Sequence, residues 1–496
     1  MSNLNYVLSK STYVRGIRCL KSLYLNKHNP GLRDKVNELT QFKFDKGKEV
    51  GILAQKLFPD GVDCGIDVTG EVGKSIVLTG ENIKKGLKTI YEAAFICNEV
   101  VAIADIITKN GGEWNVYEVK SSTEIKDYHY NDAAVQYYVL KNSGLKIKDI
   151  SLVFLDNTYV RSGELEIAEL FKIQSVNNEV IAIQKQVEEN IKNFKSVLDC
   201  KDIPDIKIGK HCKEGYDCDF IGHCFGCIPG YSIFDIPRFS RNYELYNAGI
   251  IKIEDLPDDI KLSCKQKIMV DCYINKMNFI DKQRLKDFLK SITYPLYFMD
   301  FETIQPVIPE YDNSRPYQQI PFQFSLHYRG SKDSELKHFE YLAEPNCDPR
   351  PEFIKKLIEY TKNPGKILCY NANFEKNILK SLSNDFPDYR YALNIIIDRI
   401  VDLMIPFREM SYYKPQMKGS YSLKNVLPAV VPGSDYSGLE IQDGETAALT
   451  FMKLSSIKDD SQVKKIRRNL SDYCKLDTYA LVKILEELQT NSIFTG

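Results

Sequence analysis

The amino-acid sequence predicts a mixed α/β protein with at least two domains. Its 496 residues exceed the number that one hydrophobic core usually covers. Short β-branched, apolar segments alternate with helical patterns before a cysteine-rich segment at residues 212–227, and a second strand-rich region follows residue 294. We therefore expect one module at residues 1–232, a helical connector at 233–290 and a second module at 291–496.

The composition is that of an ordinary globular protein, with 43% hydrophobic and 27% charged residues. The 66 basic and 67 acidic side chains nearly cancel, which excludes a protein that is drawn to nucleic acid by its net charge. The first six residues contain no apolar signal core, and charged residues interrupt the most apolar later stretch, 394–407. We therefore expect a cytoplasmic protein with no membrane segment.

A first candidate site lies on a predicted β-hairpin. Two strand-like segments, 99–108 and 113–121, flank a glycine-rich turn. Glu118 and Lys120 are two residues apart, so both point to one face of the sheet, and Asp105 on the neighbouring strand can approach them. The two carboxylates can bind a hard divalent cation, while the lysine can neutralise charge on a cleaved phosphate. A solvated strand face with an ion pair is the simpler interpretation of the triplet alone.

Two further polar residues flank the hairpin in the sequence. Glu49, between two glycines, lies on a probable upstream helix, and Gln136 lies on the helix after the second strand. In this order the residues resemble the PD-(D/E)xK nucleases, specifically the RecB-like exonucleases that include CRISPR-associated members. The resemblance implies that Asp105, Glu118 and Glu49 hold Mg²⁺ or Mn²⁺. It also implies that Lys120 is catalytic and that Gln136 completes the site.

The 13 cysteines are an odd number, which fits poorly with a complete disulfide framework. Many RecB-like nucleases hold a 4Fe-4S cluster with one cysteine near the N-terminus and three after the nuclease core. The resemblance implies a cluster here that joins the two ends of the domain. Its implied ligands are Cys19, Cys212, Cys218 and Cys224. A zinc site is the alternative, formed by Cys212, Cys218 and Cys224 with Cys227 or His223.

A second candidate site combines three segments from the last part of the chain. Asp300 and Glu302 end an apolar strand and share one of its faces. Tyr473 and Asp477 are four residues apart in a helical pattern, so they lie one turn apart on one helix face. Between these segments, Glu375 lies at the start of a predicted helix that follows a short strand. The spacing predicts acids that can bridge a metal ion.

The order of these motifs resembles the DEDD exonucleases of the RNase H-like fold, in the variant whose last motif carries a tyrosine. The resemblance implies that four acids hold two metal ions for hydrolysis of the 3′-terminal phosphodiester and that Tyr473 orients the attacking water. The implied metal ligands are Asp300, Glu302, Glu375 and Asp477. Glu375 stands where the family usually has aspartate, and Asp402 is an alternative ligand.

The segments 418–428 and 436–447 resemble a bacterial family that joins a RecB-like front half to an RNase H-like back half, and the resemblance covers nearly the whole chain. The resemblance implies a restriction-endonuclease-like domain, a helical connector and an RNase H-like α/β domain. It also implies a Mg²⁺- or Mn²⁺-dependent exonuclease whose partner is nucleic acid and whose main substrate is DNA with single-stranded ends.

Two alternatives stay open at this point. One half can be an idle binding module, because each half departs from its family in one position. The departures are Glu375 in the back half and, in the front half, Leu140, which replaces the tyrosine that usually follows Gln136. The substrate can also be RNA, since nothing in the sequence indicates recognition of a 2′-hydroxyl.

Overall fold

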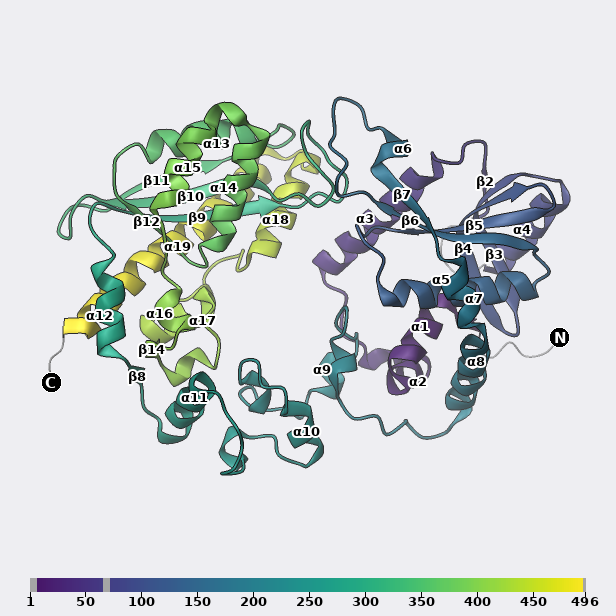
Figure 1. Ribbon diagram of the computed structural model, residues 1–496, viewed down its shortest axis with the longest axis horizontal. Helices are drawn as coiled ribbons and strands as arrows, with labels where there is room; N and C mark the ends of the chain where they lie inside the picture. Colours follow the sequence, from purple (N-terminus) through teal and green to yellow (C-terminus); the bar gives the residue numbers. More distant parts are fainter. Residues whose placement is uncertain (1–6, 66–71, 494–496) are drawn as a thin grey trace. The chain divides into compact units, whose positions relative to one another are not determined.

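The computed structural model describes residues 7–65 and 72–493, which form two compact units (Figure 1). Unit 1 comprises the chain up to Cys227 together with Val307–Tyr317, and unit 2 comprises Ile228–Pro306 and the chain from Gln318 onward. Helices and strands mix in both units, which confirms the mixed α/β class. Residues 1–6, to which the expected lack of a signal segment refers, lie outside the described residues. Within the described ranges, none of the helices combines the length and apolar character needed to cross a bilayer.

Unit 1 is built on one mixed sheet with strand order β2-β3-β4-β5-β6-β7, in which β1 also pairs with β4. Its strands are β1 (Leu8–Ser9), β2 (Val62–Asp63), β3 (Thr89–Cys97), β4 (Val100–Asn110), β5 (Glu113–Lys120), β6 (Ile147–Leu155) and β7 (Phe171–Ser175). Its helices are α1 (Lys10–Arg18), α2 (Leu20–His28), α3 (Glu38–Gln55), α4 (Val72–Lys84), α5 (Asp127–Asn142), α6 (Ile167–Leu170), α7 (Asn177–Ala182), α8 (Gln184–Asp199) and α9 (Ile221–Cys224). Because β5 and β6 are parallel, they need a crossover connection, and α5 provides it.

The hairpin predicted from the sequence is confirmed. β4 and β5 pair antiparallel from Ile106 with Tyr117 to Asn110 with Glu113. Gly111 adopts a φ of +65° in the turn between them, a conformation that glycine reaches without steric cost. α5 packs on β3, β4 and β6 and on α1 and α8, so the β4–β5 hairpin lies under a layer of helices.

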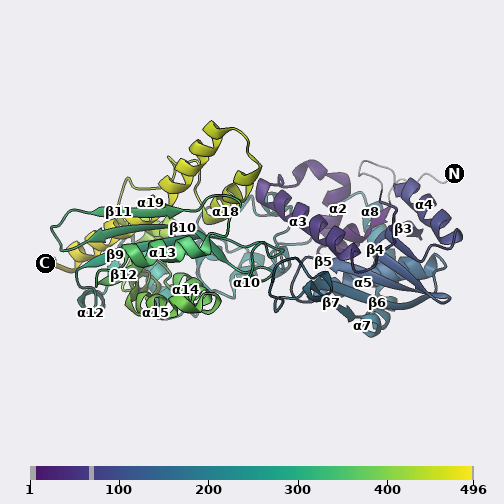
Figure 2. The same ribbon diagram turned by 90° about the horizontal axis from the view of Figure 1, so that it is seen from above.

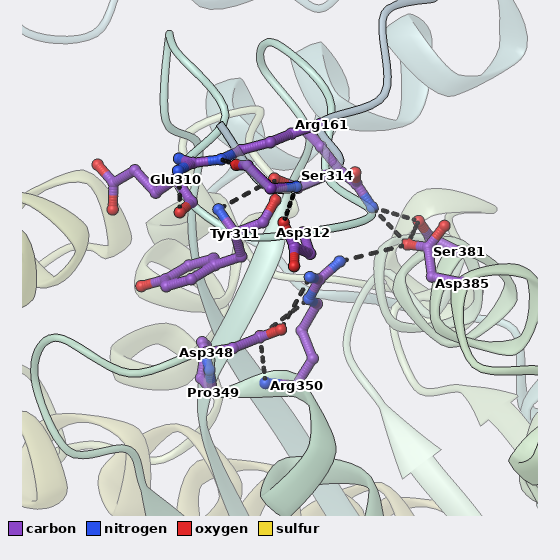
Figure 3. Close-up of polar contacts among 12 residues, drawn as sticks. Arg161, Glu310, Tyr311, Asp312, Ser314, Asp348, Pro349, Arg350, Ser381 and Asp385 are labelled. Carbon is purple, nitrogen blue, oxygen red and sulfur yellow. Dashed lines mark hydrogen bonds and ion pairs between the residues drawn. The ribbon is translucent and has the colours of Figure 1, made fainter. Parts of the chain in front are cut away.

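A segment of chain from between β9 and β10, residues 307–317, completes unit 1. Val307, Ile308 and Tyr317 pack against the apolar cluster formed by α3 with the strands of the unit 1 sheet. The guanidinium of Arg161 donates to the carbonyl oxygens of residues 309 and 310 at 3.0 and 2.9 Å (Figure 3). This packing and bonding explain why the segment, which we call the inserted segment, belongs to unit 1. The sequence did not predict it.

Unit 2 contains a sheet with strand order β11-β10-β9-β12-β13. β9, β10 and β11 pair antiparallel, whereas β12 and β13 run parallel to β9. The strands of unit 2 are β8 (Phe279–Ile280), β9 (Leu296–Ile304), β10 (Ile320–Arg329), β11 (Lys337–Leu342), β12 (Lys366–Cys369), β13 (Ile400–Asp402) and β14 (Tyr412–Tyr413). Its helices are α10 (Asn242–Asn247), α11 (Cys264–Asn275), α12 (Lys282–Lys290), α13 (Arg350–Tyr360), α14 (Asn373–Asp385), α15 (Arg390–Arg399), α16 (Ile405–Arg408), α17 (Leu423–Val430), α18 (Gly444–Lys453) and α19 (Asp460–Ile493).

The side chains of β9 alternate between two helical layers. Tyr297, Met299 and Phe301 join the apolar cluster beneath α13, α14 and α15. α19 lies on the opposite face of the sheet (Figure 2). Asp300 and Glu302 point to that face, where they meet Asp477 of α19. Successive side chains of a strand point to opposite faces, so one short sequence supplies both the core and the acids.

The helical connector predicted at residues 233–290 is not a separate module, because it groups with unit 2. β8 pairs with β14, and α12 packs on α16 and α19. Short elements of this kind bury too little apolar surface to be stable alone, so they depend on the unit that covers them.

Candidate metal centres

The acids predicted from the last part of the sequence come together in unit 2. Asp300 and Glu302 from β9 and Asp477 from α19 offer carboxylate oxygens that all lie within 4.8 Å of one another. Glu375, in the first turn of α14, is 1% exposed, and its Oε2 has no hydrogen-bond partner among the described residues. We call these four acids, with Tyr473, the rear site.

Burial and mutual repulsion raise the pKa values of the rear acids. Burial is the main cause for each, and the neighbouring carboxylates add to it at Asp300 and Glu302, whose pKa values lie well above the usual range. The pKa of Glu375 rises to about 8 and that of Asp477 to about 6. Ionisation of all four carboxylates is therefore unfavourable near neutral pH unless cations neutralise them. The unpartnered oxygen of Glu375 and the all-oxygen donor set fit a hard divalent cation.

Two tyrosines fix the orientation of Asp477. The hydroxyl of Tyr436 donates to Asp477 Oδ1 at 2.5 Å. Hydrogen bonds from Tyr436 and Tyr473 lower the pKa of Asp477 and so oppose the larger effect of its burial. Tyr473 lies one helical turn before Asp477, as the spacing predicted. Nothing in the sequence assigned Tyr436 a role in the site, because it lies on an irregular loop where no periodic pattern marks it.

Asp402, the alternative ligand, is engaged elsewhere. Its Oδ1 accepts the backbone N–H groups of Asn371 and Met404, both at 3.0 Å, and its Oδ2 pairs with Arg408 at 3.2 Å. It influences the site indirectly, since its charge contributes to the raised pKa of Glu375. The structure therefore groups Glu375, rather than Asp402, with the other rear acids.

The second constellation predicted from the sequence lies in unit 1. Glu118 is 2% exposed, and its Oε1 accepts from the Lys120 ammonium at 2.9 Å. Its Oε2 accepts from Gln136 Nε2 at 3.0 Å. Asp105 accepts the backbone N–H of Val119 at 2.6 Å. We call Asp105, Glu118, Lys120 and Gln136 the front site.

The charges of the front site are unequal. Burial, with the repulsion of Glu118, raises the pKa of Asp105 to about 6. Burial also opposes ionisation of Glu118, but the ammoniums of Lys10 and Lys120 outweigh it and lower the pKa of Glu118 to about 2. Glu118 is therefore the permanent anion of the pair. The carboxylate oxygens and the buried Oε1 of Gln136, which has no partner among the described residues, fit a divalent cation.

The structure adds three charged residues to the front site. Lys10 from α1 pairs with Glu118 Oε1 at 2.5 Å, and Asp132 from α5 pairs with Lys120. Asp132 precedes Gln136 by four residues on one helix face, a signal that sequence reasoning could have used. The third is Glu92 on β3, whose pKa rises to about 7 through burial and through the charge of Asp105.

Glu49, by contrast, does not join the carboxylate pair. Its side chain is half exposed and pairs with Lys46 on its own helix at 2.7 Å. Burial is the main cause of the raised pKa of Glu310 in the inserted segment; Lys46 opposes it, and the charge of Glu49 adds to it. The expectation that Glu49 is a ligand of the front metal therefore has no support in this arrangement of side chains.

Four cysteines far apart in the sequence line one pocket of unit 1. They are Cys19, Cys212, Cys218 and Cys224. Cys227 is exposed, and neither it nor His223 lines the pocket. Zn–S bonds of about 2.3 Å would place the sulfurs of a zinc site about 3.8 Å apart. Within the described ranges, no group of three cysteine or histidine ligand atoms is as close as 4.8 Å.

Comparison with known proteins identifies relatives of this chain, and their descriptions name no activity. A model of a domain of unknown function, DUF2779, matches residues 297–422, which include Asp300, Glu302 and Glu375 but end before Asp477. The chain is 24% identical over 278 residues to Uncharacterized protein UU173 of Ureaplasma parvum, a match to 51% of this chain and 40% of the relative. It is 23% identical over 256 residues to Uncharacterized protein MG366 of Mycoplasma genitalium, covering 47% of this chain and 38% of the relative. The chain thus matches about two fifths of the length of these relatives.

The rear acids predict that unit 2 loses stability as pH rises in the absence of metal. Because the folded pKa values of Glu375 and Asp477, about 8 and about 6, lie above ordinary carboxyl values, the folded state binds more protons than the unfolded state. This stabilisation is complete below the unfolded pKa and is lost as pH rises through the folded pKa. By calorimetry in EDTA, we expect the unfolding temperature to fall between about pH 5 and pH 8. The expected fall is roughly 3–5 °C for each unit by which the folded pKa of a group exceeds its unfolded pKa.

A matched pair of variants tests whether Glu375 causes this fall of the unfolding temperature with pH. Glu375→Gln should flatten the fall with pH, whereas Glu352→Gln, at an exposed position on α13, should leave it unchanged. Mg²⁺ should raise the unfolding temperature most at the high end of the range, where the acids are ionised. A wild-type unfolding temperature that rises steadily from about pH 5 to pH 8 in EDTA would contradict the prediction.

Proposed function

We propose that the chain is a metal-dependent nuclease with two active sites that hydrolyses phosphodiester bonds of DNA, mainly at single-stranded ends. The observation that carries the proposal is the rear group of Asp300, Glu302 and Asp477, with oxygens within 4.8 Å of one another beside the unpartnered oxygen of Glu375. Carboxylates this close repel one another unless a cation neutralises them, and hard cations prefer such oxygens.

In the rear site, Asp300, Glu302, Glu375 and Asp477 would hold the cations, which supply a water of lowered pKa and stabilise charge on the phosphate. The chain's own residues would decide from which direction that water attacks the phosphate. Tyr436 and Tyr473 fix Asp477, and the Tyr473 hydroxyl would orient the water. Lys424 on α17 carries a positive charge close enough to lower the pKa values of Glu302 and Asp477. This charge favours the approach of an anionic substrate.

In the front site, Asp105 and Glu118 would hold a cation. Gln136 fixes Oε2 of Glu118, and Lys120 is held between Glu118 and Asp132. These two carboxylates raise the pKa of Lys120 against the opposing effect of burial, so its ammonium stays protonated. A protonated lysine beside the carboxylates can neutralise charge that develops on a cleaved phosphate.

Two further features support the implied family assignments. Cys19, Cys212, Cys218 and Cys224 line one pocket, which favours the 4Fe-4S cluster over the zinc alternative and would join the two ends of unit 1. The antiparallel β9–β11 meander with parallel β12 and β13 agrees with the RNase H-like sheet implied for the back half.

A substrate comparison tests the proposal. We expect the purified chain to digest end-labelled single-stranded DNA with Mg²⁺ or Mn²⁺ and to do so more slowly with duplex DNA or RNA, with full inhibition by EDTA. A chain carrying both Glu118→Gln and Asp300→Asn controls for contaminating nucleases. Absence of EDTA-sensitive cleavage that exceeds this control, on all three substrates, would overturn the proposal. Faster cleavage of RNA than of DNA would support the RNA alternative instead.

A further inference from the structure

The front site contains a positive charge that its motif does not account for. The Lys10 ammonium, at the first residue of α1, pairs with Glu118 Oε1 at 2.5 Å, across 108 positions of sequence. Its charge and that of Lys120 both act on Glu118. Two ammoniums therefore share one carboxylate oxygen, while Gln136 occupies the other oxygen of Glu118.

The two lysines are anchored differently. Lys120 has a second partner in Asp132, so its ammonium stays in place when its bond to Glu118 is lost. Among the described residues, Glu118 is the hydrogen-bond partner of the Lys10 ammonium. A carboxylate accepts about four hydrogen bonds, and Glu118 already accepts three. A cation that binds to Glu118 would therefore displace the Lys10 ammonium more easily than the Lys120 ammonium.

We propose that Lys10 is a positioning residue that occupies Glu118 as an internal counter-cation and is displaced when a divalent cation binds to the front site. Lys10 holds Glu118 in place in the metal-free state and lowers the affinity of the front site for metal. The inference rests on the front site of the proposed function and adds a regulator of its metal loading.

Lys10 is placed by a helix that does not need its side chain. The N-cap of α1 is Ser9, whose side chain and that of Thr12 form a reciprocal capping box. Further along α1, Arg15 forms a bidentate pair with Asp219, with the longer of its two bonds at 2.9 Å. Substitution of Lys10 should therefore leave the helix in place, so its effect on metal binding can be measured in a folded chain.

Calorimetric titration with Mn²⁺ tests the proposal. The background is the full-length chain with Asp477→Asn, which weakens binding at the rear site. We expect Lys10→Met to bind Mn²⁺ at the front site about tenfold more tightly than the background chain. Lys10→Gln should act in the same direction, and Lys10→Arg, which keeps the charge, should resemble the background. A residue with a merely structural role would weaken binding when it is replaced, so the sign of the change separates the two roles.

Glu118→Gln in the same background separates failure of this inference from failure of the proposed function. If Glu118→Gln removes one Mn²⁺ site and both neutral Lys10 variants bind Mn²⁺ equally or more weakly, the role of Lys10 is overturned while the front metal site stands. If Glu118→Gln keeps the background's Mn²⁺ stoichiometry and affinity, Glu118 holds no metal, and both the front site and the role of Lys10 are overturned.

Discussion

Asp477→Asn is expected to lower metal-dependent digestion by the rear site on the order of 10²-fold or more, because even partners that only support a metal ligand typically contribute roughly 10–100-fold. Lys120→Ala should remove digestion by the front site. Each single variant should keep part of the activity, and the double variant should lose it. The measurement is the rate of release of labelled nucleotides from single-stranded DNA with Mg²⁺, compared with EDTA.

The control for Asp477 lies on the same helix. Asp472 is exposed and pairs with Arg468, so Asp472→Asn should leave digestion unchanged. Asp477→Asn removes a charge that repels Asp300 and Glu302, so its unfolding temperature in EDTA should not fall. If Asp472→Asn lost as much activity as Asp477→Asn, the result would contradict the rear-site assignment. If one single variant abolishes all digestion, the other half is a binding module, or the two sites act in sequence.

Cys212→Ser is expected to remove iron from the chain and to destabilise unit 1 by several kcal/mol. Structural metal sites contribute about 10–16 kcal/mol in small metal-dependent domains, and unit 1 keeps its own apolar core, so we expect a smaller effect here. The unfolding temperature of unit 1 should fall by roughly 10 °C or more. The measurements are iron content and the visible spectrum of protein purified without oxygen, followed by calorimetry.

Two other cysteines separate the cluster from the zinc alternative. Cys19 lines the pocket, whereas Cys227 is exposed and does not. Cys19→Ser should therefore reproduce the loss of iron, and Cys227→Ser should retain it. A colourless, zinc-bearing chain that loses its metal with Cys227→Ser but not with Cys19→Ser would establish the zinc knuckle and remove one support of the RecB-like assignment.

Relations over short stretches of sequence were predictable. The period of two in a strand placed Glu118 beside Lys120, and the helical period of nearly four placed Tyr473 beside Asp477. Relations over long stretches were not. Lys10 reaches Glu118 from the first helix, and no local pattern distinguishes it from other lysines.

Side-chain direction was a further limit of the sequence. Glu49 lies on the expected helix α3, but its carboxylate turns to Lys46 rather than to the front acids. The inserted segment was also beyond prediction, because its apolar residues Val307 and Ile308 carry no sign of which sheet they cover. Which sheet such a segment covers depends on shape and buried area, and a single sequence does not display either.

The inserted segment delays the completion of unit 1 during synthesis on the ribosome. The first unit lacks part of one apolar face until Tyr317 has been made, although its own continuous chain ends at Cys227. Translation at about 5–20 residues per second makes this a wait of roughly 5–18 s. During that time the apolar cluster that contains Val50 and Val153 lacks the packing of Val307, Ile308 and Tyr317. We therefore expect a chaperone that binds apolar surface on nascent chains to act on this cluster before Tyr317 has been made.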